Sequence, residues 1–147
     1  MVVKTYRGLL ADGGQDQLRL QTIKGKVGYR IVKFQIIQKE PGEVTIESTV
    51  KIYKSQQSTI NNTINFSDGE LLAVAVWHKS SSDAYAATNT IIFENEIFNQ
   101  DVYVTHDTTV EVGGACNYYL ELEAIPLTDQ GAEYTTLKDI RTQLTIS

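Results

Sequence analysis

Apolar residues alternate with polar ones along much of this sequence, and glycine-containing turns separate the alternating stretches. In residues 44–52 the even-numbered positions hold Val, Ile, Ser, Val and Ile, while the odd-numbered positions hold Thr, Glu, Thr and Lys. Residues 116–124 repeat this pattern. Because the side chains of a β-strand point alternately to opposite faces of its sheet, a period of two predicts strands with one buried face.

The same reading predicts further strands between the turns. The predicted strands span residues 3–9, 17–23, 27–38, 44–53, 71–78, 89–93, 101–105 and 116–124. Within 27–38 the apolar positions change parity after Ile31, which indicates a β-bulge or a strand that is buried on both faces. The tail from Leu137 fits either a helical face or a strand, and we expect an extended ending.

About eight short strands, with turn residues between them and no convincing amphipathic helix, predict an all-β fold. We expect an antiparallel β-sandwich with a jelly-roll-like topology, formed by a single domain over residues 1–147. A chain of this length buries roughly 70% of its unfolded surface, which is enough for a core without metals or disulfides. The polar stretches 56–65 and 78–89 are predicted to be exposed loops.

Charge and hydropathy argue against several classes of partner. The formal net charge is −5 and the lysines and arginines are scattered, so there is no basic stripe for nucleic acid. The longest apolar run, residues 71–77, is far shorter than the roughly 20 residues of a membrane helix. Lys4 and Arg7 interrupt the first residues, so we expect no signal peptide and a soluble, unprocessed product. The single cysteine, Cys116, is expected to be a small buried apolar residue.

One predicted strand is apolar on both faces. In residues 71–77 the odd-numbered positions hold Leu, Ala, Ala and Trp, and the even-numbered positions hold Leu, Val and Val. Either a loop or terminal segment of the same chain covers the second face, or a neighbouring subunit does. Tyrosines on otherwise polar faces favour contact with a partner, because tyrosine is enriched at interfaces. The predicted interface residues are Tyr53, Leu71, Ala73, Trp77, Tyr103 and Tyr119.

The candidate chemical groups do not form a catalytic or metal-binding pattern. Glu121 and Glu123 lie about 7 Å apart on one strand face, a spacing that paired catalytic carboxylates and a solvated strand share. Residues 94–101 offer oxygen ligands for calcium, but without the spacing of a calcium-binding loop. The candidate soft ligands are isolated from one another: His78, His106 and Cys116. We therefore predict a protein that is not an enzyme and has no catalytic residue, metal or cofactor.

Several segments taken together resemble a family of virion proteins. The segments are residues 4–8, 28–35, 50–54, 92–105 and 117–123, and the similarity extends to residue 141. Its most distinctive part is the run Phe98, Asn99, Gln100 and Asp101. On these residues the chain resembles a group of small virion-associated proteins from marine tailed bacteriophages.

The resemblance implies a component of the phage particle that works by binding other proteins. The expected partners are the major capsid protein or other virion proteins, together with further copies of this chain. We expect a decoration or cement subunit on the outer surface of the capsid, made in the host cytoplasm, and a tail, baseplate or fibre component as the alternative. From another class of protein, a carbohydrate-binding sandwich would use Trp77, Tyr85 or Tyr119 to stack on a glycan, although Trp77 lies in an apolar strand.

Overall fold

The computed structural model describes residues 3–20, 26–42, 45–109 and 114–127. These residues form eight strands, namely β1 (Val3–Leu10), β2 (Gln15–Leu18), β3 (Val27–Gln38), β4 (Ile46–Tyr53), β5 (Leu71–Lys79), β6 (Ala87–Ile92), β7 (Val102–Thr108) and β8 (Cys116–Pro126). All strand pairs are antiparallel, and no described residue is helical. The predicted antiparallel β-sandwich is therefore confirmed.

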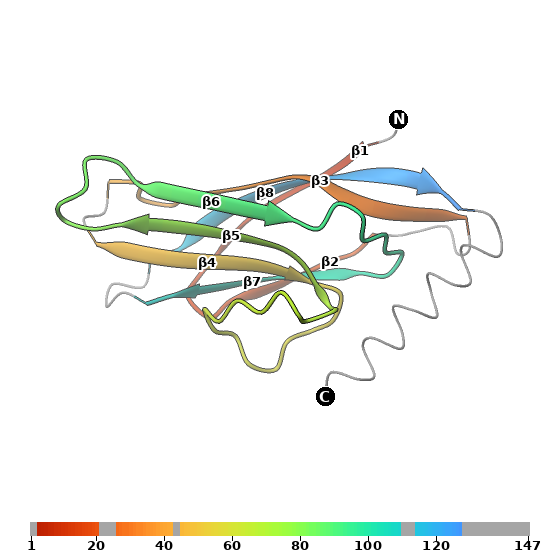
Figure 1. Cartoon of the computed structure of the whole chain (residues 1–147), viewed down its shortest axis with the longest axis horizontal. Helices are drawn as coiled ribbons and strands as arrows, with labels where there is room; N and C mark the ends of the chain where they lie inside the picture. Colours follow the sequence, from red (N-terminus) through yellow and green to blue (C-terminus); the bar gives the residue numbers. More distant parts are fainter. Residues whose placement is uncertain (1–2, 21–25, 43–44, 110–113, 128–147) are drawn as a thin grey trace.

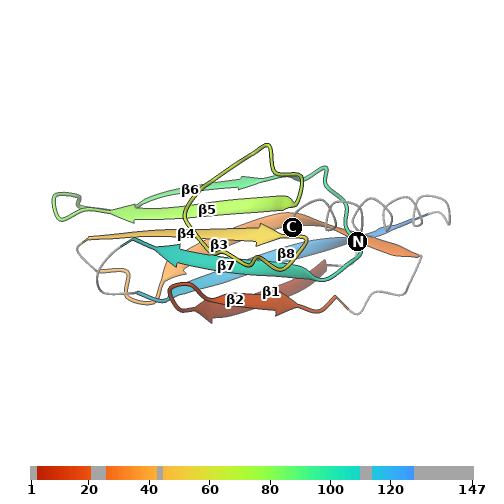
Figure 2. The same ribbon diagram turned by 90° about the horizontal axis from the view of Figure 1, so that it is seen from below.

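The strands form two sheets that pack face to face (Figures 1 and 2). One sheet has three strands in the order β1-β8-β3, and the other has five in the order β2-β7-β4-β5-β6. The pairing is nested, because β1 lies beside β8, β2 beside β7 and β4 beside β5. A long hairpin that rolls up on itself gives this nesting, which makes the sandwich jelly-roll-like. The remaining nested pair, β3 with β6, is not hydrogen-bonded, since β6 extends the five-stranded sheet instead.

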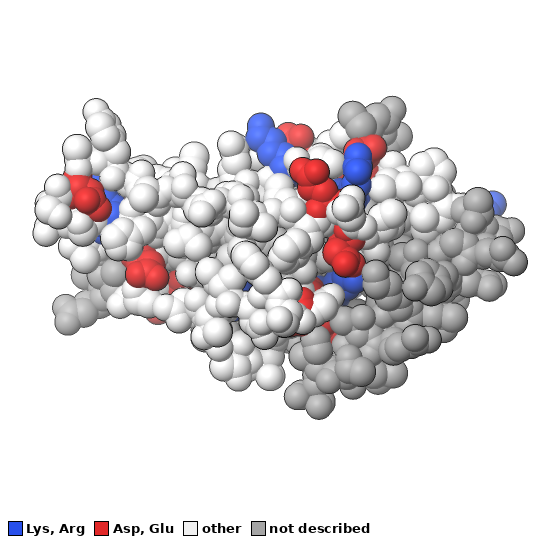
Figure 3. All heavy atoms as spheres, viewed as in Figure 1, with Lys and Arg blue, Asp and Glu red and all other residues white. Residues whose placement is uncertain are grey.

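Surface charges of opposite sign lie close together. On the side of the molecule seen in Figure 3, Lys and Arg side chains lie next to Asp and Glu side chains, and no stripe of positive charge crosses the view. In the part of the chain that the structure describes, no helix has the length and apolar character needed to cross a bilayer.

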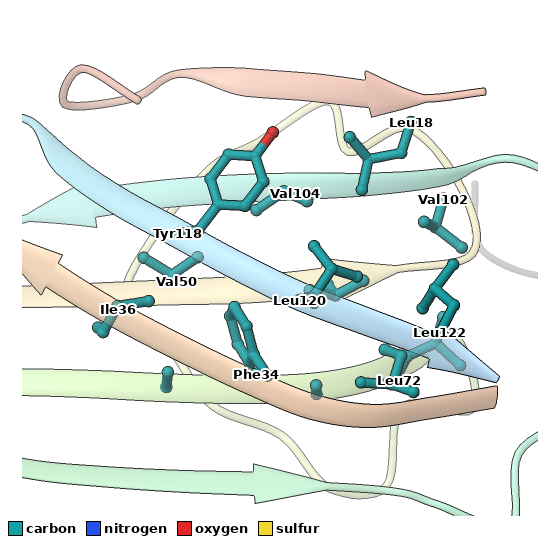
Figure 4. Packing of buried hydrophobic residues seen from close by; sticks show 14 of the residues in the cluster. Leu18, Phe34, Ile36, Val50, Leu72, Val102, Val104, Tyr118, Leu120 and Leu122 are labelled. Carbon is teal, nitrogen blue, oxygen red and sulfur yellow. The ribbon is translucent and has the colours of Figure 1, made fainter. Parts of the chain in front are cut away.

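The core lies between the sheets, and β8 supplies its centre. Tyr118, Leu120 and Leu122 point inward from β8 and are at most 3% exposed. Figure 4 shows them meeting side chains from the other strands, among them Leu18, Phe34, Ile36, Val50, Leu72, Val102 and Val104. Burying one leucine side chain contributes about 2 kcal/mol, so the alternation along β8 accounts for much of the cohesion between the sheets.

The bulge and most of the strand boundaries follow the sequence prediction. In β3 the register against β8 shifts between Ile31 and Lys33, which is where the apolar parity changes, so the predicted bulge is confirmed. The second strand is the exception: it spans Gln15–Leu18, whereas the sequence predicts 17–23. Residues 21–25 and the tail from Leu137 lie outside the described residues, so the predicted extended ending stays a prediction.

The long β4–β5 connection, residues 54–70, lies against the outer face of the five-stranded sheet (Figures 1 and 2). Lys51 points outward from β4, yet only 3% of it is exposed. Its Nζ donates hydrogen bonds to Oδ1 of Asn61 at 3.2 Å and to the carbonyl of Thr63 at 2.7 Å. A buried ammonium group needs such partners, so Lys51 ties the connection to the sheet.

Two further contacts hold the ends of the β4–β5 connection. The side-chain amide of Gln15, on β2, accepts a hydrogen bond from the backbone N–H of Gln57 at 2.9 Å and donates one to the Gln57 carbonyl at 3.2 Å. Near the other end, the ring of Phe66 meets the ring of Phe93 edge-on, with 5.4 Å between centroids. The connection is therefore anchored at β2, at β4 and beside β6.

The chain itself buries both faces of the first part of β5. Leu71 is 2% exposed, Ala73 is fully buried and Val74 is 3% exposed. Of the two explanations that the sequence leaves open, cover by the same chain is therefore correct for residues 71–75. No neighbouring subunit is needed to cover this part of β5, whereas Val76 and Trp77 further along the strand are half-buried and His78 is exposed.

A buried carboxyl group at the end of this connection gives a pH-dependent prediction. Glu70 is fully buried; one carboxylate oxygen accepts a hydrogen bond from Ser55, and Oε1 has no hydrogen-bond partner. Burial raises the pKa of Glu70 above its ordinary value. The folded state thus binds this proton more tightly than the unfolded state, so stability falls as pH rises from the ordinary pKa through the raised one.

Glu70→Gln is therefore expected to raise the thermal midpoint at pH 7, with the gain shrinking towards pH 4, because glutamine resembles the protonated acid. Differential scanning calorimetry between pH 4 and pH 8 measures this. The matched control is Glu94→Gln, since it makes the same chemical change at an exposed position. A lower midpoint for Glu70→Gln at pH 7 would contradict the prediction.

Candidate interaction surface

The outer face of the three-stranded sheet presents a mixed polar and apolar surface. The register of β1, β8 and β3 aligns its outward side chains in rows across the strands. From one end to the other the rows are Leu9, Asn117 and Ile37; Arg7, Tyr119 and Gln35; Thr5, Glu121 and Lys33; and Val3, Glu123 and Arg30. We call these twelve residues the β1-β8-β3 face.

One end of this face is apolar. Leu9 is 47% exposed and Ile37 is 56% exposed, and they flank Asn117 in the same row. A shallow hollow next to this row is lined by Arg7 and Gly8 of β1, by Gln35 and Ile37 of β3, and by residues 117–119 of β8. Two large exposed aliphatic side chains in one row are the kind of surface that a protein partner covers.

The rest of the face is charged and internally paired. The hydroxyl of Tyr119 donates a hydrogen bond to Oε2 of Glu121 at 2.6 Å, and this bond raises the pKa of the hydroxyl. Nζ of Lys33 lies 5.9 Å from the centroid of the Tyr119 ring. Arg30 donates to Oε2 of Glu123 from Nε at 3.2 Å and from the terminal nitrogen at 2.9 Å. Glu121 and Glu123 therefore each have a hydrogen-bond partner and lie on an open sheet face. This arrangement fits the interpretation of the pair as part of a solvated strand.

Tyr119 is the predicted interface residue that lies on this face, where it is half-buried. Two others, Leu71 and Ala73, are buried inside the chain's own fold and are not on the surface. Tyr53, a further predicted interface residue, lies on the outer face of the other sheet opposite the half-buried Tyr103, but only 7% of it is exposed. Burial raises the pKa of Tyr53 to about 12.

The aromatic residues expected to stack on a glycan are not gathered into one platform. Trp77 is partly buried and packs against the core, and its indole N–H is buried without a hydrogen-bond partner. Trp77, which is also a predicted interface residue, thus packs against the core, as its place in an apolar strand indicates. Tyr85 is 87% exposed in the β5–β6 hairpin, whereas Tyr119 lies in β8 on the three-stranded sheet.

The acidic residues considered as calcium ligands make contacts within the protein. Oδ1 and Oδ2 of Asp101 accept hydrogen bonds from the backbone N–H of Leu20 and the side chain of Gln17. Glu96 forms an ion pair with the buried Lys54 at 3.3 Å. Among the residues that the structure places, no three His, Cys, Asp or Glu side chains are grouped so as to hold a metal ion.

A buried pair that sequence reasoning missed lies on two neighbouring strands of the five-stranded sheet, and its histidine also contacts the end of β1. His106 on β7 and Ser48 on β4 are both fully buried, with Nε2 of the imidazole 2.9 Å from the serine hydroxyl. Nδ1 lies 3.0 Å from the carbonyl of Leu10 and 3.1 Å from that of Ala11. Carbonyls only accept, so Nδ1 carries a proton; in the neutral imidazole Nε2 then accepts a hydrogen bond from the serine hydroxyl. Burial without access to solvent makes this pair a structural link.

The remaining soft ligand, Cys116, is also part of the core. It is fully buried, as the sequence predicts, and burial raises the pKa of its thiol to about 12. The thiol is therefore unreactive at neutral pH.

Comparison of the whole sequence with models of protein families and with curated proteins finds no match.

Proposed function

We propose that this chain is a structural protein of a tailed-phage particle, a decoration or cement subunit that binds the outer surface of the capsid. The observation that carries the proposal is the β1-β8-β3 face, with Leu9 and Ile37 exposed in one row on a rigid sheet. The resemblance of residues 92–105 and 117–123 to virion proteins supports the same function. The β1-β8-β3 face replaces β5 as the candidate contact surface, because the chain itself buries both faces of residues 71–75.

The two ends of this face would have separate tasks in binding. Burial of the exposed Leu9 and Ile37 against a capsid protein supplies most of the free energy, because apolar area contributes about 25 cal/mol per Å². The charged rows around Tyr119 are already paired, so they add little affinity and set the orientation of the subunit. A hydrogen-bonded sheet would bind without rearranging, which would keep the entropic cost of binding low.

The test is a binding measurement on particles. Capsids of the phage that encodes this chain, assembled without it, are incubated with the purified protein, and bound density is located by electron cryomicroscopy. The proposal expects regularly spaced density on the outer capsid surface. Density on the tail or baseplate, or no bound protein, would overturn the decoration role.

The double substitution Leu9→Glu and Ile37→Glu is expected to weaken binding to such capsids at least about tenfold, since tenfold corresponds to only 1.4 kcal/mol and both apolar contacts are lost. The control is Ile64→Glu, because Ile64 is similarly exposed, at 41%, but lies on the β4–β5 connection. Sedimentation of capsids with labelled protein gives the affinities. Equal weakening by both variants would contradict the assignment of this face.

A further inference from the structure

Three of the four strands at the sheet edges carry a feature that discourages pairing with another chain. The edge strands are β1 and β3 in one sheet and β2 and β6 in the other. Natural edge strands are protected by charges, bulges, prolines or short length. β1 carries Lys4 and Arg7, β3 carries the bulge after Ile31, and β2 has only four residues, including Asp16.

The fourth edge strand, β6, has none of these protections. Its sequence is Ala-Thr-Asn-Thr-Ile-Ile, without a charge or a proline, and its register with β5 is uninterrupted. Its first five residues are exposed. Figure 2 shows β6 as the border of the five-stranded sheet, and in Figure 3 the charged atoms lie to either side of the surface over β6. This edge is a template for another strand.

The hydrogen-bond pattern between β5 and β6 shows which backbone groups of β6 are available to pair with another strand. The backbone N–H of Phe93 donates to the carbonyl of Leu72 at 3.0 Å, next to the last paired residues of β5 and β6. Bonded and non-bonded pairs alternate along an antiparallel ladder. Thr88, Thr90 and Ile92 therefore direct their N–H and C=O groups away from β5.

We propose that two copies of this chain pair through β6, antiparallel, about a two-fold axis at Thr90. The available groups are self-complementary in this register: Thr90 faces Thr90 of the second copy, and Thr88 faces its Ile92. Paired threonines stabilise antiparallel strands. Each copy has a net charge of −5, so an uncharged edge is where two copies approach with the least repulsion. The pair would join two five-stranded sheets into one continuous sheet.

The dimer is expected to be weak and dependent on concentration, because one pair of strands buries less area than a standard interface. On a surface that holds many subunits, weak pairing is amplified by multivalency. The inference goes beyond the proposed function, since this pairing requires no particle. A chain that dimerises through β6 but does not bind capsids would overturn the proposed function alone.

Cysteine cross-linking tests the register. In a bonded antiparallel pair the Cα atoms lie about 5.5 Å apart, within the reach of a disulfide. Oxidised Thr90→Cys is expected to give a covalent dimer on non-reducing gels, whereas Thr88→Cys, which faces Ile92 of the other copy, is not. Cys116 is fully buried and does not interfere. A monomeric Thr90→Cys, or equal cross-linking of both variants, would overturn the proposal.

Analytical ultracentrifugation tests the pairing without a cross-link. The unmodified chain is expected to dimerise as its concentration rises, and Thr90→Pro is expected to stay monomeric. The N–H that proline removes points away from β5, so the fold is retained and circular dichroism should be unchanged. If Thr90→Pro unfolds, Thr90→Lys takes its place, because like charges then meet on the axis. An unmodified chain that stays monomeric, or a proline or lysine variant that still dimerises, would overturn the proposal.

Discussion

Replacing His106 by alanine is expected to lower the free energy of unfolding by about 3 kcal/mol, because a buried cavity and unpaired polar groups appear together. The imidazole is fully buried and extends from β7 to the carbonyls of Leu10 and Ala11 at the end of β1. It is thus a hydrogen-bonded link between the two sheets. Urea denaturation at neutral pH, followed by tryptophan fluorescence and circular dichroism, measures the change.

Two further variants separate the energetic contributions of the hydrogen bonds that the two ring nitrogens of His106 make. Ser48→Ala removes the partner of Nε2 and is expected to cost about 1 kcal/mol. His106→Asn keeps an N–H donor close to the position of Nδ1, so it should recover part of the loss seen with alanine. If His106→Ala cost no more than Ser48→Ala, the link between the sheets through Nδ1 would have no energetic importance.

The regular strands could be predicted because their information is local. Along β8 the alternation of Tyr118, Leu120 and Leu122 with polar residues is sufficient to assign a strand and its buried face. The parity change after Ile31 likewise indicates the bulge, because one extra residue in a strand exchanges the inward-facing and outward-facing positions that follow it. The strand order required the structure, since no local pattern specifies that β6 pairs with β5 and not with β3.

The cover on the five-stranded sheet could not be predicted, because it depends on contacts between distant residues. Lys51 occupies a position that alternation assigns to solvent, and it is buried only because Asn61 and Thr63 supply acceptors for its ammonium group. Tyr53 lies next to it, with Nζ of Lys51 5.5 Å from the ring centroid, and is buried with it. The order of polar and apolar residues does not show which distant residues will supply these hydrogen-bond acceptors.

The candidate surface was predicted in part. Alternation along β8 places Tyr119 outward, which the structure confirms, but Leu9 and Ile37 become a patch only through the pairing of β1 and β3 with β8. The link between Ser48 and His106 was missed for a similar reason, as the two residues are 58 positions apart in the sequence. Motif spacing detects groups on one strand or helix and not those that a sandwich brings together.

Gly8→Ala is expected to lower the free energy of unfolding by about 2 kcal/mol, through a clash inside the core. Gly8 lies directly opposite Tyr118 in the ladder between β1 and β8. A Cβ atom on Gly8 would lie 2.7 Å from the Tyr118 hydroxyl oxygen and 2.8 Å from two ring carbons, which is closer than van der Waals contact allows. The ring cannot move freely, because its hydroxyl donates to Oδ2 of Asp16 on β2 at 2.8 Å.

A double-mutant cycle shows whether Tyr118 is the cause. In a Tyr118→Ala background, Gly8→Ala should cost close to nothing, because the clash is gone and alanine restricts the unfolded chain more than glycine does. Gly42→Ala is the matched control, since nothing lies within 4 Å of its added Cβ and Gly42 does not have a positive φ. Urea denaturation of the four chains of the cycle and of the control gives the free energies. If Gly8→Ala cost as much without the tyrosine ring as with it, the strain would lie in the backbone of β1 and not in the packing between the sheets.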